Sequence, residues 1–390
     1  KTPLGPHGIR PRPVRRPAMP ASLCRVRINF DHLRHNLALL RASGKPLMPV
    51  VKADAYGHGL TEVSAALAVE GVDHLAVGAV AEGARLRQSG FGGCIVALLG
   101  VVDDEDLVAA RTYGITPLVH DRPGLRRLIE REQSSGEPLG VAVKCDTGMA
   151  RLGFAVEDMA EVAEALAACP GLRAEMLVSH LAVADDPDED AYTRAQATRF
   201  GEAARALRTR FPGLRLSLGN TACLLAFPEL AGDLARPGLA LYGCNPLHGT
   251  SRAILGAGLE PVMEVRAPVL AVHPLSSGHT LGYGRTYAAA TDRMVAVVGI
   301  GYADGYRRNP APGTCMTLRG LRAPVIGRVA MQMTCLDITG FPEKGVNVRP
   351  GDEAFILGGP GHAVTAGELA EWWGTIPYEV TCLLGKNRAN

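Results

Sequence analysis

The stretch LMPVVKADAYGHG, residues 47–59, decides how this chain is interpreted. Its apolar first half is typical of a short buried strand, and the glycines and histidine that follow Lys52 indicate a turn. A lysine at the end of a buried strand is costly unless it has a function. Burial lowers the pKa of its amine, and a neutral amine attacks carbonyl groups. Lys52 is therefore the leading candidate to hold an aldehyde cofactor; the alternative is a strand-end lysine that reaches solvent.

Lysine is rare in this sequence, which has six lysines against thirty-five arginines. Four lysines lie in polar stretches marked by glycine or proline. Only Lys52 and Lys144 end apolar runs. The two positions are therefore the candidates for lysine chemistry.

The composition indicates a large globular protein. With 390 residues, 47% of them hydrophobic, the chain can form a large core and two domains. The net charge of +2, with both signs mixed, gives no reason to expect nucleic acid or a membrane surface as a partner, and no apolar run could span a bilayer. Nine cysteines without a C-x-x-C pair are typical of reduced residues in a cytoplasmic protein. We expect no metal site.

The N-terminal residues 1–23 differ from the rest. Five positive charges and no acid occur in the first sixteen residues, which are also rich in proline. The segment lacks the apolar core of a secretion signal, so we expect a disordered leader, with Met19 as a candidate start.

Residues 24–256 alternate between apolar runs and amphipathic helical patterns. Helices are expected at Asp31–Ala42, with Asp31 as N-cap, at Val156–Ala168 and at Asp190–Thr209. A first strand is expected at Val26–Phe30. Eight further strand candidates follow: Leu47–Lys52, His74–Gly78, Cys94–Leu99, Ile115–His120, Leu139–Asp146, Leu172–His180, Leu214–Asn220 and Ala235–Tyr242. Eight such units predict an α/β fold with a (β/α)8 TIM barrel. A doubly wound sheet is the alternative, but no strand precedes a dinucleotide-binding glycine motif.

Residues 257–390 predict a C-terminal β-rich domain. Short valine-rich runs are broken by Gly, Pro and Asp, and one helix is expected late, at Ala366–Trp373. The strand candidates are Val262–Val272, Met294–Ile300, Ala323–Val329 and Glu353–Leu357.

Polar residues follow the barrel strands at the end where barrel enzymes carry their active sites. These residues are Lys52, Lys144, Asp146, His180, Asn220 and the segment around Arg236. Each taken alone has a structural explanation, such as a strand-end ion pair or a core histidine. Their common position predicts a site.

The run VVKADAYGHG, residues 50–59, resembles the lysine motif that binds pyridoxal phosphate (PLP) in alanine racemases. The resemblance extends from Val26 to Gly385. Further motifs follow in the order that the family has: KCDTGMARLG at 144–153, MLVSH at 176–180, RPGLALYG at 236–243, GYGRTY at 282–287, GYADG at 301–305 and GRVAM at 327–331. It implies a PLP barrel whose first strand joins the C-terminal domain. It also implies a homodimer whose active sites are shared between subunits.

The resemblance implies how PLP is held. Lys52 would bind it covalently, and Arg236 would face its pyridine nitrogen. Arginine only donates hydrogen bonds, so it would keep that nitrogen unprotonated, weaken the electron sink and favour return of the proton over transamination. His180 would lie beside the ring and contact Arg236. The other implied cofactor-binding residues are Tyr56, Asn220, Thr221, Gly238, Leu239 and Tyr378. Thr221 stands where serine is more usual and keeps the hydroxyl.

The resemblance also implies the substrate-binding and catalytic groups. Arg151 would contact the substrate carboxylate, and Lys144 is the candidate for carbamylation, which would orient Arg151. Tyr283 would be the second catalytic base, supplied with Met331 by the other subunit. Tyr302 would contact substrate, and Asp185, Arg308, Arg328 and Ile376 would line the entrance. Gln332 departs from the family pattern, where Asp is expected, and this departure puts substrate selection in doubt.

The prediction is a PLP-dependent alanine racemase that uses two bases, Lys52 for D-alanine and Tyr283 for L-alanine. One alternative is a racemase of broader specificity, for serine or basic amino acids, since a pocket discriminates small side-chain differences by only a few kcal/mol. Less favoured alternatives are a decarboxylase on the same barrel, a PLP-carrier protein without catalysis, and a metal-free barrel enzyme.

Overall fold

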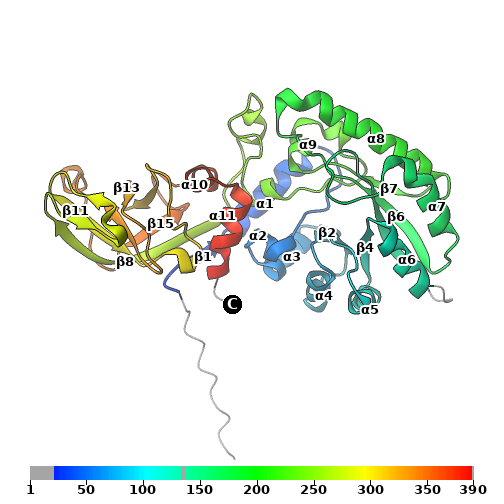
Figure 1. Ribbon diagram of the computed structural model, residues 1–390, viewed down its shortest axis with the longest axis horizontal. Helices are drawn as coiled ribbons and strands as arrows, with labels where there is room; N and C mark the ends of the chain where they lie inside the picture. Colours follow the sequence, from blue (N-terminus) through cyan, green and yellow to red (C-terminus); the bar gives the residue numbers. More distant parts are fainter. Residues whose placement is uncertain (1–21, 133–136, 389–390) are drawn as a thin grey trace, which may run out of the picture.

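The computed structural model describes residues 22–132 and 137–388. A helix-wrapped barrel forms one part and an antiparallel β domain the other, with α1 and α11 between them (Figure 1). The predicted leader, residues 1–23, lies outside the described residues except for its last two. Of these, Ser22 donates a hydrogen bond of 2.5 Å to Asp304 of the β domain.

The barrel contains six parallel strands in sequence order. They are β2 (His74–Val77), β3 (Cys94–Ala97), β4 (Ile115–Val119), β5 (Leu139–Lys144), β6 (Leu172–Val178) and β7 (Arg215–Ser217). Two short extended segments close the ring through parallel bridges between Leu47 and Ala235 and between Val50 and Ala76. The predicted barrel followed by a β-rich domain is therefore confirmed.

The first and last predicted barrel strands are wrong in extent. Each forms bridges rather than a regular strand, because Pro49 and Pro237 interrupt them and proline has no N–H to donate. Residues 239–242 form a 3-10 turn, Leu239–Tyr242, instead of continuing the eighth strand.

The helices of the barrel domain are α1 (Phe30–Arg41), α3 (Leu60–Val69), α4 (Val80–Gln88), α5 (Asp104–Tyr113), α6 (Arg122–Arg131), α7 (Met159–Ala167), α8 (Asp190–Arg208) and α9 (Thr221–Ala226). The segment labelled α2 (Lys52–Tyr56) is a turn with left-handed backbone. The predicted N-cap of α1 is wrong. Asn29 caps this helix, because its Oδ1 accepts hydrogen bonds from the N–H groups of Asp31 and His32. Asp31 lies in the first turn and pairs with Arg34 instead.

The β domain is built on one antiparallel sheet. Its strands are β1 (Arg25–Ile28), β8 (Met263–Leu275), β11 (Arg293–Val298), β12 (Cys315–Leu318), β13 (Leu321–Ile326), β14 (Thr334–Asp337) and β15 (Glu353–Leu357). β1 pairs with β8, so the first strand of the chain belongs to this sheet. β15 pairs with both β12 and β8 and closes the sheet on itself. A two-stranded ribbon, β9 (Thr280–Leu281) and β10 (Tyr287–Ala288), projects from it.

Two helices complete the domain, α10 (Ala366–Trp373) and α11 (Pro377–Leu384). α11 lies where the two hydrophobic cores meet. Val380 and Leu384 pack in the core of the β domain, whereas Tyr378 and Cys382 pack against the barrel core. The last helix of the chain therefore carries side chains of the β domain to the barrel.

Candidate active site

A cavity of about 1720 Å³ opens at the carboxyl ends of the barrel strands and is bordered by α10 and α11. The structure brings thirteen of the predicted site residues together in its lining: Lys52, Tyr56, Lys144, Arg151, His180, Asp185, Asn220, Thr221, Arg236, Gly238, Leu239, Ile376 and Tyr378. They come from distant parts of the sequence. The barrel topology gathers them because parallel strands end on one face.

Lys52 follows the first barrel segment and opens a turn of unusual conformation. The next four residues, 53–56, all have φ between 52° and 55°, although none of them is glycine. The left-handed conformation costs roughly 1–2 kcal/mol for each such residue. Strain of this kind persists only where surrounding contacts enforce it, and it is concentrated at functional sites.

The amine of Lys52 lies in a positive environment. Its side chain is exposed within the cavity, whose walls enclose it in part. Burial is the largest cause that lowers its pKa, and the charge of Arg151 lowers the pKa further. The lowered pKa increases the fraction of neutral amine, the form that acts as nucleophile or base.

Two residues that the sequence analysis missed hold this turn. The carboxylate of Glu82, on α4, accepts hydrogen bonds from the N–H groups of Ala53 at 2.7 Å and Gly78 at 2.8 Å. His58 is fully buried and donates from Nδ1 to the carbonyls of Ala55 and Tyr56. His58 was visible in the lysine motif. Glu82 was not, because the N-cap residue of its helix is Ala79, and a capping box is recognised in sequence by serine or threonine at that position.

Arg236 is 4% exposed and is held by the strand ends around it. Nη1 donates to the carbonyl and the hydroxyl of Ser217, both at 2.6 Å, and Nη2 donates to the carbonyls of Ser179 and Leu218. Burial lowers its pKa to about 10, so the guanidinium remains charged at neutral pH. A buried cation is therefore fixed inside the cavity wall.

His180 lies beside this cation. Its Nδ1 is 3.4 Å from Nη2 of Arg236. Burial first, and then the charges of Arg236 and Lys144, lower the pKa of the imidazole well below its usual value. His180 is therefore neutral, so Nδ1 can accept from the arginine.

Lys144 ends β5 and faces the same cavity as Arg151. Burial, and next the charge of Arg236, lower its pKa to about 7. The charge of the neighbouring Asp146 acts in the opposite direction but is outweighed. One Asp146 carboxylate oxygen accepts hydrogen bonds from three backbone N–H groups, at 148–150. Lys144 is therefore a buried lysine with a substantial neutral fraction at neutral pH.

One end of the cavity presents backbone N–H groups without protein acceptors. Among the described residues, none accepts from the buried N–H groups of Thr221, Ala222 or Leu239. Gly238 donates to Thr221 Oγ1 at 2.9 Å, and a Cβ on Gly238 would come within 2.7 Å of the Tyr56 hydroxyl. Free N–H groups, hydroxyls and a glycine that permits close approach form a cradle that fits a phosphate group.

Tyrosine rings border this end. Tyr56 lies between Tyr242, with ring centroids 5.0 Å apart, and Tyr378, at 5.5 Å. Burial raises the pKa of Tyr378 to about 12, so its hydroxyl stays protonated and can donate a hydrogen bond. Asn220 caps α9, and its Oδ1 accepts from the N–H of Cys223. Asn220 therefore positions the helix that carries Thr221.

The remaining predicted residues do not line the cavity of this chain. Tyr283, Tyr302 and Met331 are 64%, 41% and 58% exposed on the β domain. Their segments are adjacent, since the N–H of Tyr302 donates to Ala330 at 3.1 Å. Arg308 and Arg328 are also exposed there. Tyr283 and Met331, the two residues implied to act across a subunit boundary, are therefore exposed on the β domain and away from the cavity of their own chain.

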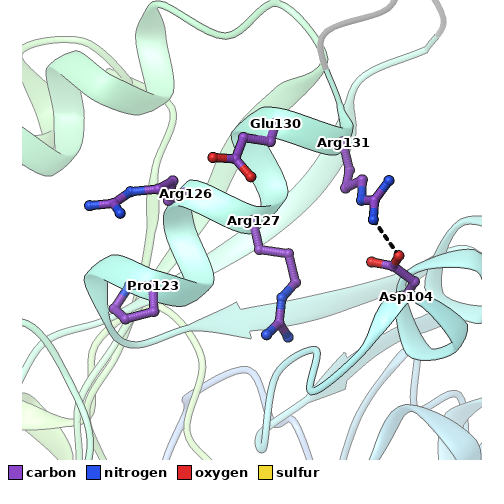
Figure 2. A pocket seen from close by; sticks show the side chains of 6 residues that line it. All are labelled: Asp104, Pro123, Arg126, Arg127, Glu130 and Arg131. Atoms are coloured by element: carbon purple, nitrogen blue, oxygen red, sulfur yellow. Dashed lines mark hydrogen bonds and ion pairs between the residues drawn. The ribbon is translucent and has the colours of Figure 1, made fainter.

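A second hollow, of about 410 Å³, lies outside the barrel against α6 (Figure 2). Arg131 pairs with Asp104 across it, Arg127 donates to the carbonyl of Val102, and Glu130 is nearby. Its charges largely balance, and none of the residues predicted for the site lies in it. We assign the chemistry to the larger cavity.

No group of three or more His, Cys, Asp or Glu side chains that could hold a metal ion is found within residues 22–132 and 137–388. In the same residues, no helix is long and apolar enough to cross a membrane. The groups that the cavity does present are the amine of Lys52, the cation of Arg236 and backbone N–H donors.

Fold and cavity together define an α/β-barrel enzyme whose C-terminal β domain completes the site. The chain belongs to the alanine racemase family. Its residues 28–246 match the model of the alanine racemase N-terminal domain, and residues 262–390 match that of the C-terminal domain. The resemblance inferred from the motifs is confirmed.

Curated relatives and solved structures agree with this assignment. The alanine racemases of Nitratidesulfovibrio vulgaris (strain Miyazaki F) and Lawsonia intracellularis are 48% and 44% identical, over 93% and 94% of this chain and 96% of each relative. The structure of alanine racemase from Clostridium difficile 630 has a TM-score of 0.83 and 31% identity, covering 94% of each chain. The biosynthetic alanine racemase of Pseudomonas aeruginosa has a TM-score of 0.81 and 30% identity, covering 93% of this chain and 96% of that one.

Proposed function

We propose that this chain interconverts L- and D-alanine with pyridoxal phosphate bound to Lys52. One observation carries the proposal. In a member of the alanine racemase family, a lysine of lowered pKa shares a cavity with a buried arginine and a cradle of free N–H groups. The amine suits an aldehyde, the cradle suits a phosphate, and the arginine suits an unprotonated ring nitrogen.

Each part of the cofactor has a proposed partner. Lys52 would hold the aldehyde carbon, and Arg236, with His180 beside it, would donate to the ring nitrogen. The phosphate is bound by the cradle formed by Tyr56, Asn220, Thr221, Gly238, Leu239 and Tyr378. When bound, pyridoxal phosphate supplies a carbonyl that joins the substrate amine and a conjugated ring that stabilises the charge left by the α-proton. Arg236 limits that stabilisation, which favours return of the proton.

Two bases move the proton in the proposed reaction. The neutral Nζ of Lys52 takes or returns the α-proton on one face of the substrate, the face used for D-alanine. The phenol of Tyr283, from a second copy of the chain, serves the opposite face for L-alanine. Arg151 binds the substrate carboxylate. The neutral Lys144 amine adds carbon dioxide and loses a proton, and the resulting carbamate anion orients Arg151.

The exposed face of the β domain supports a homodimer. Met333, which is 47% exposed, lies on a segment hydrogen-bonded to that of Tyr302 and Met331, and Tyr283 is a further exposed apolar residue of this domain. Contiguous exposed apolar side chains mark interaction sites. In a two-fold dimer this face would cover the cavity of the partner, with Met331 and Tyr302 near substrate. The entrance would then combine Asp185 and Ile376 of one copy with Arg308 and Arg328 of the other.

We place the enzyme in the cytoplasm. All nine cysteines, each within the described residues, are free. A reducing compartment keeps such thiols unpaired.

The reaction is tested with protein reconstituted with pyridoxal phosphate. We expect L-alanine to lose its optical activity and D-alanine to accumulate, and we expect borohydride to fix a pyridoxyl group on Lys52 in peptide maps. Label on Lys144 would refute the lysine assignment. Loaded enzyme that racemises no alanine would refute the function.

A further inference from the structure

The turn that follows Lys52 has a buried support that the reaction itself does not use. We propose that His58 is a positioning residue, which holds the left-handed backbone of residues 53–56 and thereby directs Lys52 and Tyr56 into the cavity. The inference rests on the proposed function only in giving these two side chains the cofactor as their ligand.

The contacts of His58 fall within the strained turn. Nδ1 donates to the carbonyl of Ala55 at 3.0 Å and to that of Tyr56 at 3.1 Å. Both acceptors belong to residues with positive φ, at 53° and 54°. A carbonyl only accepts, so Nδ1 must carry the hydrogen. One side chain therefore satisfies two carbonyls of the least favourable backbone in the site.

Through Tyr242, the same ring is also linked to the segment that precedes Lys52. It stacks on Tyr242 with centroids 4.4 Å apart, and the Tyr242 hydroxyl donates to the carbonyl of Val50 at 2.9 Å. His58 thus connects the segment before Lys52 with the turn after it. Burial lowers the pKa of His58 to about 4, so it acts as a neutral donor.

The second ring nitrogen of His58, Nε2, makes no hydrogen bond within the part of the chain that the structure describes, so only Nδ1 explains why the residue is polar. Nε2 is buried and has no hydrogen-bond partner among the described residues. A buried polar atom without a partner is costly. Donation by Nδ1 therefore accounts for a polar residue here, whereas packing alone would favour an apolar ring.

Three substitutions separate the donor from the packing. His58→Asn places an amide N–H near the position of Nδ1. His58→Gln places its amide farther out, near Nε2, and His58→Phe keeps a stacked ring without any donor. Leu128→Ala, in the barrel core on α6, is the control for general loss of stability, because Leu128 is buried and lies on a different helix.

The first measurement is amide hydrogen exchange of residues 52–60 in cofactor-free protein. The second is kcat and KM for alanine after reconstitution. We expect His58→Phe and His58→Gln to speed exchange in this segment and to lower kcat, each by about ten-fold, the effect of losing one buried hydrogen bond. His58→Asn should restore both values most of the way. Leu128→Ala should lower the Tm without changing either.

The inference fails if His58→Phe exchanges and reacts like wild type, or if Leu128→Ala reproduces its effects. It also fails if Asn and Gln behave alike, and this comparison decides the matter should the Phe variant not fold. A wild-type protein without racemase activity would refute the proposed function, while the exchange experiment would still test the role of His58.

Discussion

Lys144 offers a quantitative test of the electrostatics of the cavity. Replacing it by methionine keeps the length of the side chain and removes the charge. In the folded protein without carbon dioxide, burial lowers the pKa of Lys144 from 10.5 to about 7. Each pKa unit is worth about 1.36 kcal/mol. The buried ammonium therefore costs on the order of 5 kcal/mol of folding free energy at low pH.

The sign of the pH dependence follows from proton binding. Below pH 7 both the folded and the unfolded states are protonated at Lys144, and the full cost is present. Between about pH 7 and 10.5 the unfolded state holds more protons than the folded state, so stability rises with pH. The advantage of Lys144→Met over wild type should therefore fall from about 4 kcal/mol at pH 7 to about 2 kcal/mol at pH 9.

The assay is urea unfolding of the cofactor-free proteins in carbon dioxide-free buffer at pH 6, 7, 8 and 9. Lys344→Met serves as the control, because Lys344 is exposed on the β domain, and its difference from wild type should stay flat with pH. A difference for Lys144→Met that is constant, or that grows with pH, would show that the buried amine is not neutralised by its surroundings.

Three further predictions concern catalysis. Lys52→Ala and Tyr283→Phe should each be nearly inactive alone. Refolding them together in equal amounts should recover about a quarter of wild-type activity, since half the dimers pair the two variants and each of these has one intact site. No recovery, with mixed dimers shown to form, would remove Tyr283 as the partner's base. Alanine should be racemised far faster than serine, lysine or arginine, and a comparable kcat/KM for a basic amino acid would assign a broader specificity to the site with Gln332. Glu82 raises the pKa of Lys52, so Glu82→Gln should move the acidic limb of the kcat profile, which reports the Lys52 amine freed in the substrate complex, to lower pH; an unmoved limb would separate Glu82 from the amine.

The sequence could predict elements whose pattern is local. β15 and α10 have the predicted bounds, because each is a compact run between turn residues. The inner barrel strands were located to within a few residues by their apolar runs. β12 and β14 were missed, since each has only four residues (CMTL and TCLD), too few for a clear alternating pattern.

The site was predictable where strand ends carry polar residues and less so where tertiary contacts decide. Lys52, Lys144 and Arg236 follow barrel segments, so the topology places them together. The left-handed turn could not be predicted, because Ala53 and its successors have no intrinsic preference for positive φ. Glu82 enters the site through hydrogen bonds to backbone groups, which no side-chain pattern records.

The arginines of the cavity affect both of its lysines in the same direction, although the two lysines have different proposed roles. Burial and nearby arginines lower the pKa of both amines. The charge of Glu82 raises the pKa of Lys52 and so partly offsets this lowering. Lys52 can therefore both accept and release a proton. Lys144 has only Asp146, whose carboxylate is engaged by backbone N–H groups, and it is the more buried. Arg236, proposed for the ring nitrogen, and Arg151, proposed for the substrate carboxylate, thus keep one lysine ready for proton transfer and leave the other open to modification.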